Sequence, residues 1–286
     1  TVLRDLGDEA VEHRSFGAGA GSQRVLFLHE HLEGATPALH GRLRELAVQA
    51  SATAGWGLVQ GDTLRNRCAE LILYRGAGQP SSDSTEKIDW HNDGVTMVTL
   101  AVMLSEEGSY SGGAIRLRGP GWDGVESHSL KAGDALAWRG WTEHDVETVW
   151  FGDRQVLVTE WWFGPDAAQS GRPRMGDLPQ LTRQALELDP AQPLLHYLHG
   201  RALCRRLPCE GSEAAEGARA SFLRAIELGP GEESSLSGLG FFLLGGSFAD
   251  WLQGVAYLHE ACVRRAEKAG AERPAAGAVR AWLRWG

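Results

Sequence analysis

Three side chains in the first half of the sequence have the types and spacing of a metal site. His91 and Asp93 stand two residues apart in Trp90-His91-Asn92-Asp93. On an extended segment, residues i and i+2 point to the same side, so one imidazole and one carboxylate converge. His144 is the best candidate for a third ligand, and it follows a segment expected to form a strand ending at Trp138. Two histidines and one carboxylate on one face of a metal leave three positions open, as in non-heme Fe(II) sites that use O₂.

An arginine follows the third candidate ligand. Arg154 lies ten residues beyond His144, where it is expected to begin the next strand. A guanidinium there could bind a carboxylate through two hydrogen bonds in a buried pocket. An ion pair with Asp153 or Asp145 at the protein's rim is an equal alternative. A lone H-x-D triplet is weak evidence, since such triplets arise by chance and most histidines are not ligands.

Apolar and alternating segments around these residues predict a β-rich first half. A short strand is expected at 25–28 and a helix at 37–51. The later expected strands are 69–74, 95–104, 114–118, 134–138 and 155–163. The polar segment 76–89 is expected to be a loop beside the first ligand pair.

The second half has a different composition, in which Leu and Ala dominate. Segment 164–180 has the Gly- and Pro-rich character of a linker. Beyond it, Ala185-Leu-Glu-Leu-Asp-Pro190 recurs as Ala225-Ile-Glu-Leu-Gly-Pro230. With Gly200, Ala218 and Phe222 between the copies, this order resembles a tetratricopeptide (TPR) array of about two units. We expect an insertion near 208–212, and a generic helical bundle is the alternative.

Six segments of the first half follow one another in the order of a known family. They are Leu73–Gln79, His91-Asn92-Asp93, Val95–Leu104, Ser111–Leu117 with its Gly-Gly turn, Lys131–Trp138 in the pattern K-x-G-D-A-L-x-F, and the set His144, Val146, Gly152 and Arg154. Together they make the region from about 25 to 163 resemble the prolyl 4-hydroxylase-type family of 2-oxoglutarate/Fe(II) dioxygenases. Six ordered matches are far more specific than any single one.

The resemblance implies an α+β chain with two domains. A double-stranded β-helix (jelly-roll) catalytic domain at 1–165 is expected to be followed by a linker at 166–180 and an all-α TPR-like domain at 181–286. His91, Asp93 and His144 would bind Fe(II). Arg154 would hold the distal carboxylate of 2-oxoglutarate, and the Tyr74 hydroxyl would be a second contact. O₂ is the other co-substrate, and ascorbate is an additional candidate cofactor.

This sequence departs from the family pattern at several positions. Arg154 stands where many relatives have lysine, and the interval from Tyr74 to His91 is longer than usual. The aromatic residues of the strand after the first ligands are replaced by Thr99, Ala101, Val102 and Met103. Counting by twos from Arg154 places Trp162 on the same strand face. We expect Trp162 either to line the substrate mouth or to pack in the core.

The reaction implied is hydroxylation of an unactivated C–H bond, coupled to oxidative decarboxylation of 2-oxoglutarate to succinate and CO₂. A prolyl residue in a peptide or protein is the first expected substrate. A free amino acid or small metabolite is the alternative. A different class of function is a TPR-type peptide-binding scaffold with an oxygen-sensing or inactive dioxygenase domain, and a third is a metal enzyme that does not use 2-oxoglutarate. The carboxylate of Asp93 counts against a halogenase.

Net charge and the lengths of apolar runs bear on two other kinds of partner, nucleic acids and membranes. The 286 residues carry a net charge of −9, which argues against nucleic acid. No apolar run approaches the roughly 20 residues of a membrane span, and the first residues lack a signal-peptide profile. The compartment stays open. None of the four cysteines forms a CxxC pair, although Cys204 and Cys209 are close enough in sequence to approach each other.

Overall fold

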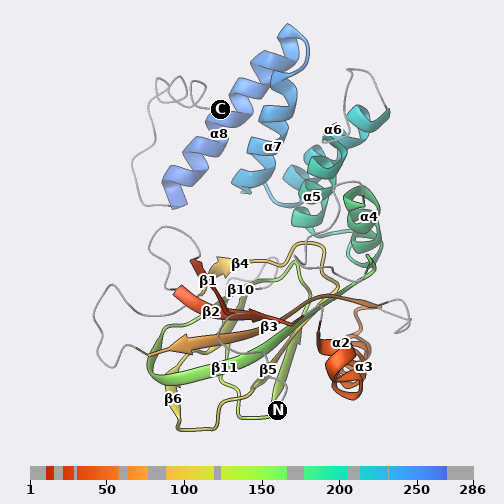
Figure 1. Ribbon diagram of the computed structural model, residues 1–286. Helices are drawn as coiled ribbons and strands as arrows, with labels where there is room; N and C mark the ends of the chain where they lie inside the picture. Colours follow the sequence, from red (N-terminus) through yellow and green to blue (C-terminus); the bar gives the residue numbers. More distant parts are fainter. Residues whose placement is uncertain are drawn as a thin grey trace. The chain divides into compact units, whose positions relative to one another are not determined.

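The computed structural model describes residues 11–15, 22–28, 31–57, 64–76, 88–118, 124–165, 177–204, 213–230 and 232–268. The chain forms two compact units, Thr1–Pro173 and Arg174–Gly286, which are described in turn (Figure 1). The division between the units falls within the segment 166–180 that the sequence analysis assigned to a linker. The first helix of the second unit already begins at Leu178.

Unit 1 contains two antiparallel sheets (Figure 1). The larger sheet has the order β1-β2-β3-β11-β5-β9, and β6 also pairs with β11. Its strands are β1 (Val11–Ser15), β2 (Ser22–Phe27), β3 (Arg65–Arg75), β5 (Val98–Met103), β6 (Tyr110–Gly112), β9 (Ala135–Trp138) and β11 (Val149–Trp162). The smaller sheet has the order β4-β10-β7-β8. Its strands are β4 (Ile88–His91), β7 (Ile115–Arg118), β8 (Glu126–His128) and β10 (Glu143–Val146).

The core of unit 1 lies between the two sheets. Its buried side chains come from strands of both: Val25, Ile72, Tyr74, Ile88, Ala101, Ile115, Leu117, Trp138, Val146, Val149 and Val156. Burial of these apolar side chains from both sheets in one cluster is the main force that holds the sheets together. The mixed architecture with antiparallel sheets agrees with the expected α+β class, and its assignment as a double-stranded β-helix is taken up below as a proposal.

Helix α3 (Pro37–Ala54) packs against β5 and β11 of the larger sheet. It begins with a proline in its first turn and ends at Gly55, whose φ of 68° suits a helix C-terminus. The short helix α2 (Leu32–Ala35) precedes it. The ring of His40 on α3 lies 5.3 Å from that of Trp161 on β11. Because α3 covers the second face of the larger sheet, nearly every residue of β5 is buried.

Several predicted strands are present with shifted bounds, and five short strands were missed. The missed strands are β1, β4, β6, β8 and β10. These strands are short and rich in polar residues, and none was recognised by a clear alternation or apolar run, as the equally short β7 and β9 were. The loop predicted at 76–89 is wrong at its end, because β4 begins at Ile88, and its residues 77–87 lie outside those described.

Unit 2 consists, in its described residues, of five helices, each packed on the next. They are α4 (Leu178–Leu188), α5 (Pro193–Cys204), α6 (Glu213–Leu228), α7 (Glu233–Leu244) and α8 (Phe248–Lys268). Both copies of the repeated hexapeptide end a helix, α4 and α6 respectively. A Cβ at Gly200 would lie 2.9 Å from the ring of Phe222, so a glycine is needed where α5 meets α6. The TPR assignment stays a prediction.

No helix among the described residues is long and apolar enough to cross a membrane. Cys68, Cys204 and Cys262 are free thiols. Cys209 and the insertion expected near 208–212 lie outside the described residues.

Candidate active site

The three candidate metal ligands come together at one edge of the smaller sheet. His91 is the last residue of β4, and His144 on β10 is its cross-strand partner. Their rings are 4.2 Å apart between centroids. Asp93 lies in the turn after β4, where its backbone N–H donates to the carbonyl of Gly140 at 2.6 Å. His144 follows the strand ending at Trp138, as the sequence analysis expected, but it lies in a further short strand, β10, that was not predicted.

The ligand atoms of these residues face one another. Nε2 of His91 is 3.9 Å from Oδ1 of Asp93, and Nε2 of His144 is 3.7 Å from Oδ2. One ligand atom from each of the three residues lies within 4.8 Å of the other two. The set can therefore hold one metal ion through two nitrogens and a carboxylate.

Hydrogen bonds orient the two imidazole rings so that their Nε2 atoms can face a metal. Nδ1 of His91 lies 2.8 Å from the carbonyl oxygen of Asp89, and Nδ1 of His144 lies 3.0 Å from that of Thr142. A carbonyl only accepts, so each Nδ1–H donates to it and each Nε2 is the nitrogen left to face a metal. Burial lowers the pKa of His144 below its ordinary value, although the charge of Asp93 opposes this. His144 is therefore neutral at pH 7, which is the form that binds metals.

Arg154 lies inside unit 1 and not at its rim. It is the sixth residue of β11, with a 1% exposed side chain, and its cross-strand partner is Tyr74. Within the described part of the chain, its Nε and Nη1 have no hydrogen-bond partner. The rim alternative is wrong: Asp145 is bound by Arg116 through two hydrogen bonds, and Asp153 lies 3.7 Å from Arg75. A buried guanidinium with unused donors calls for an anionic ligand.

Gly113 makes room for this arginine. Its φ is 71°, and a Cβ built there would lie 2.5 Å from Cδ of Arg154. The Gly-Gly turn recognised in the sequence thus has a steric reason, because any side chain at Gly113 would displace the guanidinium.

The other two predicted site residues are both buried. The ring of Tyr74 lies 5.0 Å from Cζ of Arg154, so it stacks against the guanidinium. Contact of its hydroxyl with a co-substrate stays a prediction. Trp162 is 1% exposed, and its indole N–H donates to the carbonyl of Pro165 at 2.8 Å. The structure places Trp162 in tight packing beside Arg67, and its predicted role in substrate binding stays a prediction.

Sequence reasoning missed two side chains that contact the ligands. The Thr99 hydroxyl donates to Oδ2 of Asp93 at 2.6 Å. The ring of Trp138 lies 4.8 Å from that of His144. Trp138 is 4% exposed, and its Nε1 has no partner among the described residues. The sequence analysis recognised the motif Lys131–Trp138. Trp138 stands where the motif has phenylalanine, and its indole N–H was the sequence signal for an additional hydrogen-bond donor.

Comparison with known proteins gives likenesses in structure only. No family model matches the sequence, and no curated protein matches it. Similar solved structures include a 2OG-Fe(II) oxygenase family oxidoreductase from Burkholderia pseudomallei, with a TM-score of 0.41 and 12% identity over 58% of this chain and 80% of that one. A prolyl-4-hydroxylase from Pseudomonas putida has a TM-score of 0.40 and 16% identity over 56% and 80%.

A prolyl hydroxylase from Trichoplax adhaerens, in complex with a hypoxia inducible factor oxygen degradation domain peptide, has a TM-score of 0.40 and 12% identity over 56% of this chain and 74% of that one. Structural neighbours of this protein therefore include 2OG-Fe(II) oxygenases. Because these three TM-scores are below 0.5, a functional assignment has to rest on the site itself.

Proposed function

We propose that unit 1 is an Fe(II)- and 2-oxoglutarate-dependent oxygenase with a double-stranded β-helix fold. One observation carries the proposal: a fully buried Arg154 with unpartnered N–H groups stands in the same two-sheet unit as a His-Asp-His ligand set. The ligand set alone would suit several metal enzymes. The buried cation adds a requirement for an anionic ligand, which 2-oxoglutarate would meet.

The residues fit an Fe(II) ion. His91 and His144 offer Nε2 lone pairs, and Asp93 offers a carboxylate oxygen. Two nitrogens and one oxygen on one side suit Fe(II) and leave positions for other ligands. A structural zinc site would instead be expected to have four protein ligands, often cysteines.

The residues also fit 2-oxoglutarate. Arg154 would hold one carboxylate, with the ring of Tyr74 supporting its guanidinium. Trp138 adds a second buried donor without an acceptor. Both groups only donate, so a ligand rich in acceptors, such as a dicarboxylate, would satisfy them.

When bound, iron and 2-oxoglutarate supply the activation of O₂ for hydroxylation of a C–H bond. The residues of the protein would bind the metal, orient its ligands and exclude water. His91, Asp93 and His144 fix the metal, and the carbonyls of Asp89 and Thr142 fix the two rings. The apolar core keeps water from Arg154, so its charge acts in a medium of low polarity.

A prolyl residue in a peptide is the first substrate that we propose, on the motif resemblance, and a free amino acid or small metabolite is the alternative. The second unit has a pocket of about 540 Å³ lined by Tyr197, Arg201, Cys204, Phe222, Ser237, Gly238, Phe241 and Phe242. This aromatic pocket supports a role of the TPR-like unit in docking a peptide or protein, and it also favours the scaffold alternative.

The test is succinate formation by anaerobically iron-loaded protein that is then given 2-oxoglutarate and air. We expect succinate, and its rate should rise with the true substrate among proline-rich peptides and free amino acids. A protein that binds neither Fe(II) nor 2-oxoglutarate would contradict the proposal. Peptide binding that persists in the absence of any oxygenase chemistry would favour the scaffold alternative.

Replacement of Trp138 by phenylalanine tests the second buried donor. The change keeps an aromatic ring against His144 and removes the unpartnered N–H. We expect the affinity for 2-oxoglutarate to fall about tenfold, as for one lost hydrogen bond to a charged group. The measurement is a titration of the iron-loaded protein with 2-oxoglutarate in the absence of air. An unchanged affinity in a variant of normal thermal stability would show that Trp138 only packs.

A further inference from the structure

A bulge in the larger sheet directs one arginine toward the metal-ligand turn. Glu160 of β11 pairs with Cys68 of β3, but the next residue, Trp161, pairs with Asn66. Arg67 is therefore the extra residue on β3. A bulge breaks the alternation of a strand and turns a side chain away from its regular face, and bulges are common beside active sites.

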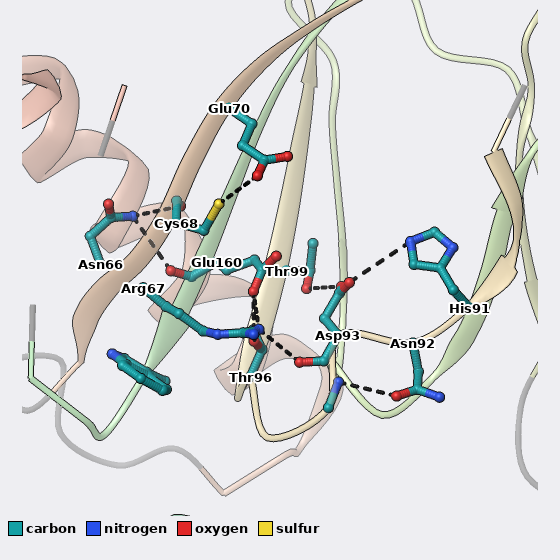
Figure 2. A network of polar contacts seen from close by, with 12 residues as sticks. Asn66, Arg67, Cys68, Glu70, His91, Asn92, Asp93, Thr96, Thr99 and Glu160 are labelled. Atoms are coloured by element: carbon teal, nitrogen blue, oxygen red, sulfur yellow. Dashed lines mark hydrogen bonds and ion pairs between the residues drawn. The ribbon is translucent and has the colours of Figure 1, made fainter. Parts of the chain in front are cut away.

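The guanidinium of Arg67 contacts three groups through one nitrogen (Figure 2). Nη1 donates to the backbone carbonyl of Asp93 at 2.8 Å and to Oγ1 of Thr96 at 2.6 Å. It also forms an ion pair with Oε2 of Glu160. The Thr96 hydroxyl in turn donates to the same carboxylate oxygen of Glu160 at 2.9 Å. These bonds join β3, β11 and the turn that carries a metal ligand.

The network is shielded from water. The side chains of Arg67 and Glu160 are 18% and 15% exposed. Trp162 covers the guanidinium, with Cζ of Arg67 5.6 Å from its ring centroid. The Asn66 amide braces the bulge by donating to the carbonyls of Cys68 and Glu160. A shielded ion pair with additional hydrogen bonds has a more fixed geometry than an exposed one.

Two other hydrogen bonds hold Asp93: its N–H donates to the carbonyl of Gly140, and its Oδ2 accepts from Thr99. Arg67 adds a third hydrogen bond, which it donates to the backbone carbonyl of Asp93. Glu160 keeps Arg67 in place, since its carboxylate opposes the guanidinium. Burial pushes the pKa of Glu160 upward, and the charge of Arg67 opposes that rise and favours the carboxylate.

We propose that Arg67 and Glu160 are positioning residues, which hold the Asp93 turn so that its carboxylate stays in place to share a metal with His91 and His144. The inference rests on the proposed metal site, but it does not depend on turnover or on the identity of the substrate. An ion pair that only stabilised the fold would not need to reach the carbonyl of a ligand residue.

The experiment measures Co(II) binding to the full-length protein. Co(II) replaces Fe(II), and its visible absorption reports the geometry of its ligands. Arg67→Met keeps the apolar stem and removes all three contacts of Nη1. We expect its dissociation constant for Co(II) to rise about tenfold or more, as is typical for lost partners of metal ligands, with an altered spectrum. Glu160→Gln leaves an oxygen that can accept from Arg67, so we expect a smaller rise and a spectrum close to that of the wild type.

Leu43→Ala is the control for stability. Leu43 is a buried residue of α3, and it belongs neither to the Arg67 network nor to the candidate ligand set. Its replacement should lower the melting temperature without changing the Co(II) spectrum. A wild-type Co(II) affinity and spectrum in Arg67→Met would overturn the positioning role while leaving the metal site intact. Failure of the wild type to bind Co(II) would overturn the metal site and this role together.

If Arg67→Met does not fold, Arg67→Lys and Glu160→Gln carry the test. Lysine retains the charge but is shorter and has a single nitrogen, so it should restore folding with weakened Co(II) binding. Wild-type binding in both of these variants would overturn the proposal.

Discussion

His144→Ala is expected to abolish succinate formation from 2-oxoglutarate and to weaken Fe(II) binding at least about 100-fold. His144 supplies one of only two nitrogens in the candidate ligand set. Its Nδ1–H is held by the carbonyl of Thr142, and its burial keeps the ring neutral at pH 7. The ring is held in place by packing between those of His91 and Trp138. The measurements are Fe(II) titration under nitrogen and succinate formed in air.

His128→Ala is the matched control for this experiment. His128 lies on β8 of the same sheet, near Glu126, and it is not in the candidate ligand set. We expect its Fe(II) affinity and its succinate formation to be those of the wild type. Normal succinate formation by His144→Ala would show that the metal, or the reaction, lies elsewhere.

Arg154→Met is expected to weaken 2-oxoglutarate binding about 100-fold while Fe(II) binding is unchanged. The side chain is 1% exposed, and two of its nitrogens have no acceptor in the described part of the chain. Two hydrogen bonds from a charged donor, each contributing about 1.5 kcal/mol, correspond to a factor of this size. The measurements are anaerobic titration with 2-oxoglutarate and the rate of succinate formation as the 2-oxoglutarate concentration is raised.

Thermal stability distinguishes a role of Arg154 in binding 2-oxoglutarate from a role in stabilising the fold. An unpaired buried charge destabilises the fold, so Arg154→Met should be at least as stable as the wild type when 2-oxoglutarate is absent. Added 2-oxoglutarate should raise the melting temperature of the wild type only, because a ligand stabilises the state that binds it. Equal stabilisation of both proteins would mean that another group holds the co-substrate.

Gly113→Ala provides a second variant with the charge intact. Its new Cβ would lie 2.5 Å from Cδ of Arg154, so the guanidinium has to shift. We expect weaker 2-oxoglutarate binding here too. Arg154→Lys should retain part of the affinity, because a single ammonium replaces the two-pronged guanidinium.

The H-x-D pair and the order of six motifs selected His91, Asp93 and His144, which the structure brings together. The expected geometry of the pair differs, because Asp93 lies in the turn after β4 and not on an extended segment with His91. For Arg154, the local sequence left a buried pocket and a rim ion pair with Asp153 or Asp145 equally open, and the resemblance favoured the pocket. Only the fold shows that Arg116 takes that carboxylate.

Other features depend on contacts between distant segments, which no local pattern records. The pairing of His91 with His144 requires β4 and β10, two short strands rich in polar residues that gave no strand signal in the sequence. The role of Arg67 depends on a bulge defined by its register with β11. In sequence, Arg67 is one charged residue among others near the start of a strand.

Strand β11 also determines where this protein can vary in length. Arg154 and Glu160 lie on it six residues apart, about 20 Å along an extended chain. Between them, β11 is paired with β3 on one side and β5 on the other. Loss or gain of a single residue in this interval would turn one of the two side chains to the opposite face of the sheet. Insertions and deletions should therefore be tolerated in the connections between strands and excluded from this interval, which makes 154–160 a segment of fixed length in any redesign of the protein.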